Sequence, residues 1–110
     1  MSNKDEKMVE KLLSNDNRQR TVGIFTLLHS SKKSLYVDEL IDSSKSSDGQ
    51  IRQGAIMVLA KIKSKEVIPV LKKALKDKYE GTRIVAALGL ARKGENSAIP
   101  TLKLIIKNDH

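Results

Sequence analysis

The chain has 110 residues and a net charge of +8, with 39% hydrophobic and only 3% aromatic residues. This length corresponds to one domain with an aliphatic core, and it leaves no room for a separate catalytic domain. The absence of cysteine excludes disulfides, thiol catalysis and cysteine-ligated metals. The start of the chain is polar, and no apolar run approaches the roughly 20 residues of a membrane span, so we expect a cytoplasmic protein.

Apolar residues recur at helical spacing throughout the chain, which predicts seven short helices and no strand. Asp48 is the expected N-cap of the fourth helix, Pro69 lies in the first turn of the fifth, and Gly94 ends the sixth. Asn96 or Ser97 is the expected cap of the seventh. The predicted helices span residues of about 4–14, 16–30, 34–44, 49–62, 66–76, 80–93 and 96–107.

The second half of the chain contains one pattern twice, 31 residues apart, and the first third contains a weaker copy. The repeated pairs are Arg52/Arg83, Ala55/Ala86, Leu59/Leu90, Ala60/Ala91, Ile68/Ile99, Pro69/Pro100, Leu71/Leu102 and Lys76/Lys107. A fixed period of this length is typical of a solenoid, in which each unit buries its apolar face against its neighbours. We therefore predict a single all-α solenoid domain of about three and a half repeats, with a half repeat at 4–14 and units at 16–44, 48–76 and 80–107.

The repeated residues resemble a known family. The pattern Asp77-x5-Arg83-x2-Ala86-Ala87-x-Gly89-Leu90-Ala91, followed by Gly94 and by Ala98-Ile99-Pro100-x-Leu102, is similar to the short HEAT-like repeat named from phycobilisome lyases. The first unit departs from it, with Asp38 in the position of Pro69. The resemblance implies a right-handed superhelix of antiparallel helix pairs, with the second helix of each pair on the concave face. It also implies a non-enzymatic scaffold or interaction module.

An arginine recurs near the start of the first helix in each unit, at Arg20, Arg52 and Arg83. A guanidinium group donates to several oxygens at once, so these side chains are suited to joining neighbouring repeats. The expected partners are the carboxylates of the preceding turns, Asp16, Asp48 and Asp77. We interpret all six as a structural ladder between repeats.

The positive charge is concentrated in the second half, because residues 1–60 carry a net +1 and residues 61–110 a net +7. On the second helices, five lysines form a predicted ladder: Lys45, Lys76 and Lys107 at intervals of 31, with Lys72 and Lys103 one turn earlier. Such a row predicts an anionic ligand, either the acidic surface of a partner protein or the phosphates of a nucleic acid bound without sequence preference. Alternatively, lysines near helix C-termini stabilise the helix dipole without any partner.

The last helix is unusually apolar. Leu104 and Ile105 stand where the preceding repeat has Lys73 and Ala74. An exposed apolar patch at this position predicts a homodimer contact or a docking surface, and denser packing against the preceding helix is the alternative.

Catalytic chemistry has little basis in the sequence. His29 and His110 are the only histidines and lie too far apart to act together, so we expect no catalytic residue, metal or cofactor. Asp38, Glu39 and Asp42 are interpreted as a solvated helix face, with a weak site for a divalent ion or a basic partner as the alternative. The expected function is a small protein-binding module, and a lyase-like accessory role follows from family analogy alone.

Overall fold

The computed structural model describes residue 7 and residues 10–108, and this part of the chain contains helices and no strand. Most of the first predicted helix, including Met8 and Val9, lies outside the described residues, although residues 10–12 are helical. The elements are α2 (Asn17–Leu28), η1 (Lys33–Tyr36), α3 (Val37–Ser43), α4 (Gly49–Leu59), α5 (Val67–Ala74), α6 (Glu80–Arg92), η2 (Asn96–Ala98) and α7 (Ile99–Asn108).

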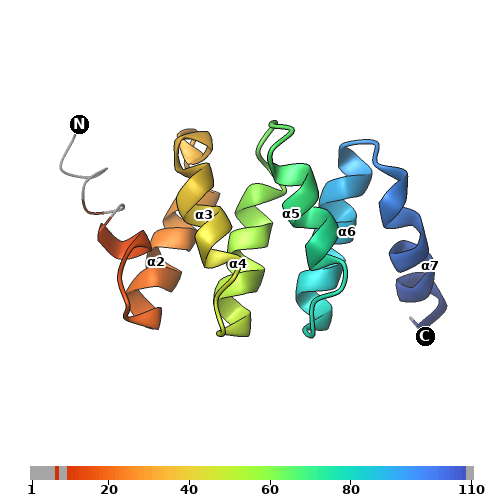
Figure 1. Cartoon of the computed structure of the whole chain (residues 1–110), viewed down its shortest axis with the longest axis horizontal. Helices are drawn as coiled ribbons and strands as arrows, with labels where there is room; N and C mark the ends of the chain where they lie inside the picture. The colour runs from red at the N-terminus through yellow and green to blue at the C-terminus, as the bar shows by residue number, and fades with distance from the viewer. Residues whose placement is uncertain (1–6, 8–9, 109–110) are drawn as a thin grey trace.

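The helices stand side by side along the long axis of an elongated molecule, with extents of 46 × 25 × 21 Å (Figure 1). The first helices α2, α4 and α6 pack directly on one another, whereas α3 packs on α4 and α5 packs on α6. Each of these second helices is therefore held mainly by the first helix of the next unit. This arrangement confirms the predicted all-α solenoid.

The core is aliphatic and continuous between units, as the composition predicts. Leu27, Leu59 and Leu90 from the first helices and Leu40 and Leu71 from the second helices have no exposed surface. Each unit thus supplies leucines to one shared core, and burial of such side chains is the main stabilising term of a solenoid.

Local signals in the sequence explain most helix ends. The Asp48 carboxylate accepts the N–H groups of Gln50 (2.8 Å) and Ile51 (3.2 Å), which confirms it as the N-cap of α4. Gly94 has φ of 77°, the left-handed conformation that follows a helix C-terminus, so it ends α6 as predicted. Pro69 lies in the first turn of α5, where a missing N–H is tolerated.

The predicted cap of the last helix is wrong. Asn96 and Ser97 belong to a 3₁₀ turn that precedes α7, and the N–H of Ala98 bonds to the carbonyl of Glu95 at 3.3 Å. The tighter turn satisfies this N–H group through the backbone, so neither side chain is needed as a cap. None of the described helices combines the length and the apolar character that crossing a bilayer requires.

Candidate functional site

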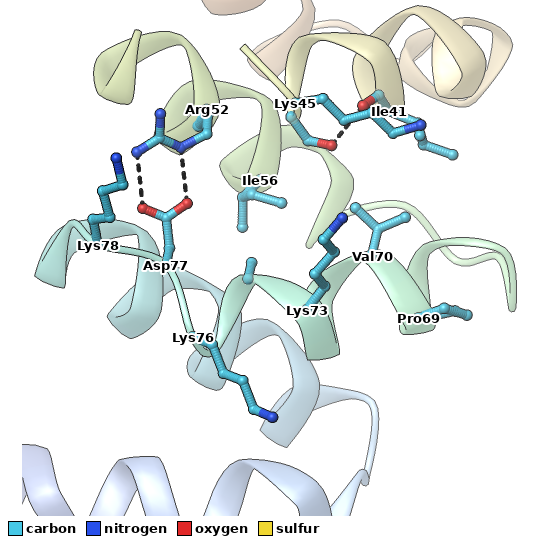
Figure 2. A pocket seen from close by; sticks show the side chains of 12 residues that line it. Ile41, Lys45, Arg52, Ile56, Pro69, Val70, Lys73, Lys76, Asp77 and Lys78 are labelled. Carbon is cyan, nitrogen blue, oxygen red and sulfur yellow. Dashed lines mark hydrogen bonds and ion pairs between the residues drawn. The ribbon is translucent and has the colours of Figure 1, made fainter. Parts of the chain in front are cut away.

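The arginine of the central unit pairs with the turn that follows its own unit. Arg52 donates from Nε to Asp77 Oδ2 (2.9 Å) and from Nη2 to Asp77 Oδ1 (3.1 Å) (Figure 2). Its Nη1 donates to the carbonyls of Ser46 (2.9 Å) and Ser47 (3.2 Å). The two charged side chains are 13% and 12% exposed. A two-pronged contact with so little exposure fixes the α5–α6 turn against the start of α4.

This pairing shifts the acid–base equilibria of both groups. The hydrogen bonds from Arg52 hold the pKa of Asp77 below its usual value, and the N–H of Tyr79 lowers it further. Asp77 in turn raises the pKa of Arg52. Both groups are therefore charged in the folded protein.

The partners predicted for Arg20 and Arg52 are wrong. Arg20 pairs with Asp42 at 2.7 Å, and the Asp16 carboxylate instead accepts the N–H of Arg18 and caps α2. The Asp48 carboxylate likewise caps its own helix, α4, and Arg52 pairs with Asp77.

The remaining members of the predicted ladder also join the turns. Arg83 donates to the backbone carbonyls of Asp77 (2.7 Å) and Lys78 (3.0 Å), not to the Asp77 carboxylate. Asn17 donates to Asp48 across the α2–α4 contact at 3.1 Å. The arginines therefore stabilise the turns between units by several different bonds.

A groove of about 730 Å³ lies between α3 and α5, with α4 beneath it. We call it the α3–α5 groove. Its residues come from α3 and the turn after it, from α4, and from α5 and the turn after that; they are Ile41, Ser44, Lys45, Arg52, Ile56, Pro69, Val70, Lys73, Ala74, Lys76, Asp77 and Lys78. Figure 2 shows Lys73 extending from α5 into this space, with the Arg52–Asp77 pair at one end.

The α3–α5 groove combines an apolar lining with a positive rim. Ile41, Ile56, Val70 and Ala74 are its aliphatic residues. The side chains of its four lysines are exposed and make no hydrogen bond or ion pair with any residue in the described part of the chain; they are Lys45, Lys73, Lys76 and Lys78. This positive charge is available to an external anionic group.

Only two of the five lysines of the predicted ladder line the α3–α5 groove, Lys45 and Lys76. Lys72 forms an ion pair with Glu95 at 3.2 Å, and Lys103 and Lys107 are exposed on α7, outside the lining of this groove. Lys73 and Lys78 complete the groove and were missed. The sequence contains one signal for Lys73. The equivalent position of the next repeat is Leu104, and a position whose residue type differs between repeats is typical of the surface.

The apolar residues of the last helix line a second groove, of about 490 Å³, between α5 and α7. We call it the α5–α7 groove, and its residues are Leu75, Glu80, Arg83, Ile84, Thr101, Leu104 and Ile105. Leu104 is 59% exposed, while Ile105 is partly buried. Neither residue is fully buried, so both are accessible from the α5–α7 groove.

The carboxylates and histidine considered in the sequence do not come together. Asp42 is engaged by Arg20, Asp38 is exposed, and one carboxylate oxygen of Glu39 is buried without a hydrogen-bond partner. His29 is exposed at the end of α2, and His110 lies outside the described residues. Across residue 7 and residues 10–108, no group of His, Asp and Glu side chains is arranged to hold a metal ion.

Comparison with known proteins agrees with the helical architecture. A family model described as HEAT repeats matches residues 37–110, from α3 through α7. No curated protein is similar enough to count as a match. HEAT repeats generally mediate protein–protein interactions and generally serve as scaffolds without enzymatic activity. The match covers more than half of the chain, and the chain therefore belongs to the HEAT-repeat family.

Proposed function

We propose that this protein is a non-enzymatic binding module that holds an acidic segment of a partner protein in the α3–α5 groove. The observation that carries the proposal is the set of four lysines around a partly aliphatic lining, none of which has a partner among the residues that the structure describes. Lysines around a groove attract and orient an acidic segment. The partly exposed Ile41 and Val70 contribute further binding free energy when the segment removes them from water. The groove lies on the second-helix side, which the family resemblance identifies as concave.

A protein segment matches this groove better than a nucleic acid does. Phosphates would contact the lysines but leave the partly exposed Ile41 and Val70 in contact with water. No aromatic side chain lines the groove on which a base could stack. An acidic peptide that also carries aliphatic side chains would satisfy both parts of the lining.

The test is fluorescence anisotropy with a labelled peptide of alternating Glu and Leu residues. We expect the variant with Lys45, Lys73, Lys76 and Lys78 changed to Gln to bind about tenfold to a hundredfold more weakly, since each exposed ion pair contributes about 0.2–1 kcal/mol. The matched control changes four exposed lysines outside the groove to Gln: Lys61, Lys63, Lys65 and Lys103. Both variants lose the same charge, so equal loss of binding in the two would contradict a site in the groove.

The same two variants separate a protein ligand from a nucleic acid. Short duplex DNA should bind weakly and lose affinity equally in both variants, because backbone attraction follows the total charge. If DNA binds more tightly than the peptide and only the groove variant loses it, the nucleic-acid alternative replaces our proposal. The lyase-like role stays a hypothesis by analogy, and the groove chemistry adds nothing to it.

A further inference from the structure

The two grooves occupy equivalent positions in successive repeats. Residues that line the α3–α5 groove have counterparts 31 residues later in the α5–α7 groove: Ser44/Leu75, Arg52/Arg83, Val70/Thr101, Lys73/Leu104 and Ala74/Ile105. Both grooves adjoin α5. This helix contributes Val70 and Lys73 to the α3–α5 groove, and Leu75, the residue after its end, lines the α5–α7 groove. They are therefore neighbouring parts of one surface.

The chemistry of the two grooves differs. The α3–α5 groove is lined by four lysines and one acidic residue, Asp77, which Arg52 neutralises. Among the described residues, the lining of the α5–α7 groove contains no lysine and consists largely of Leu75, Ile84, Leu104 and Ile105. Its two charged residues, Glu80 and Arg83, have opposite signs. The four lysines therefore attract an acidic side chain to the first groove, whereas the second groove has no excess of positive charge to attract one.

We propose that one extended partner segment crosses α5 and occupies both grooves, with acidic residues in the α3–α5 groove and large, uncharged apolar residues in the α5–α7 groove. This inference rests on the proposed function and adds the sequence pattern that the partner must have. Equivalent helices of neighbouring repeats are about 10 Å apart, and an extended chain advances about 3.3 Å per residue. The acidic and apolar centres of the segment are thus about three residues apart.

A partner of this chemistry explains the surface better than a second copy of the chain. A symmetric dimer through Leu104 would bring together the exposed Lys103 and Lys107 of both copies, with like charges opposed and the α3–α5 groove left empty. An acidic segment instead places opposite charge beside the lysines and covers Leu104 at the same time.

The probe is a labelled synthetic peptide with three Glu residues, a single Gly and a Leu-Phe pair, which puts the acidic and apolar centres three to four residues apart. It is assayed by anisotropy in both sequence orders, with the tighter order used. Two comparison peptides replace either the Glu residues by Gln or the Leu-Phe pair by Ser-Ser. We expect the wild-type protein to bind the mixed peptide at least tenfold more tightly than either comparison peptide.

The decisive variant is Leu104→Lys, which places in the α5–α7 groove the residue type that Lys73 supplies to the α3–α5 groove. We expect it to lose about tenfold in affinity for the mixed peptide and none for the Ser-Ser peptide, whose Glu residues need only the first groove. The matched control is Leu88→Lys, the same change at a 44% exposed leucine of α6 outside both grooves, and it should bind all three peptides as the wild type does. Circular dichroism verifies that both variants are folded.

Each contrary result has a distinct meaning. Wild-type affinity of Leu104→Lys for the mixed peptide would overturn the two-groove segment but leave the acidic segment in the α3–α5 groove standing. Failure of the four-lysine groove variant to weaken any peptide would overturn both proposals. A wild-type dimer in sedimentation that Leu104→Lys converts to a monomer would overturn this inference by assigning the second groove to another copy of the chain.

Discussion

At the scale of single residues, Arg52 connects three parts of the chain. Its guanidinium group bonds to Asp77 before α6 and to the Ser46 carbonyl before α4, and its Cζ lies 5.2 Å from the centre of the Tyr79 ring. Asp77 also accepts the N–H of Tyr79 at 2.9 Å. One ion pair thus holds two inter-unit turns in place at the end of the α3–α5 groove.

Replacing Asp77 by Asn should destabilise the protein by about 2 kcal/mol at pH 6, the usual scale for hydrogen bonds to charged groups. The folded protein lowers the pKa of Asp77, so its stabilisation is complete above the usual value of 3.8 and is lost as the pH falls below that value. The difference in unfolding free energy between wild type and Asp77→Asn should therefore shrink from pH 6 to pH 2.5. Urea denaturation followed by circular dichroism measures it.

The matched control is Glu66→Gln. The Glu66 side chain is exposed and makes no hydrogen bond or ion pair with the residues that the structure describes. It precedes α5, so its replacement should cost at most the helix-dipole contribution of about 0.3–1 kcal/mol, less than Asp77→Asn. A difference for Asp77→Asn that stays constant between pH 6 and pH 2.5 would show that the charge of Asp77 is not the source of its stabilisation.

Residue types and spacing could predict the presence of the arginine contacts but not their partners. The carboxylates of Asp48 and Asp77 both lie near Arg52, the first along the chain and the second in space. Residue spacing alone does not choose between them. Similarly, Lys72 and Lys73 are adjacent in α5 but about 100° apart around its axis. Lys73 consequently lines the α3–α5 groove while Lys72 pairs with Glu95 on another side.

At the scale of helices, the close approach of α6 to the end of α4 depends on a glycine. A Cβ atom on Gly89 would lie 2.6 Å from the Cβ of Ala60 and 3.3 Å from its Cα. Gly89 is in the middle of α6, where glycine normally costs about 1 kcal/mol relative to alanine. The structure explains why it is tolerated, because the two backbones could not approach so closely with a larger residue.

Gly89→Ala should therefore destabilise the protein by about 1 kcal/mol or more, since the overpacking of 1–3 kcal/mol exceeds the gain in helix propensity. Adding Ala60→Gly should remove the clash, so that the double variant costs less than the two single changes together. Urea denaturation of the wild type, the two single variants and the double variant measures this coupling free energy. A Gly89→Ala protein more stable than wild type would contradict the close contact.

The helices themselves could be predicted closely from the sequence, because apolar periodicity and end signals agree. Residues 49–62 were predicted as the fourth helix and form α4 (Gly49–Leu59), with Asp48 as its cap. The helices after less regular turns begin later than predicted, as at α3 and α7, where 3₁₀ turns come first. Periodicity does not distinguish a 3₁₀ turn from the first turn of an α-helix, since both place apolar residues three positions apart.

At the scale of the whole molecule, the first helices pack closely on one another, and two grooves lie beside the second helices of the stack. The aliphatic residues that repeat most regularly, including Leu59 and Leu90, are buried in the core. The positions that differ between repeats, such as Lys73 and Leu104, remain on the surface of the grooves. The spacing that repeats between units thus builds the scaffold, and the differences between units give the two grooves the chemistry on which our proposals rest.

The most direct test of our account is to map the bound acidic peptide by ¹⁵N–¹H NMR on the 110-residue protein. We predict that the amide signals of residues lining the α3–α5 groove, including Lys45, Val70 and Lys73, shift most as the peptide of alternating Glu and Leu residues is added. Signals on the outer side of the first helices, such as Phe25 and Leu88, should not move. Shifts concentrated on that outer side, or spread evenly over all lysines, would contradict a binding site in the groove.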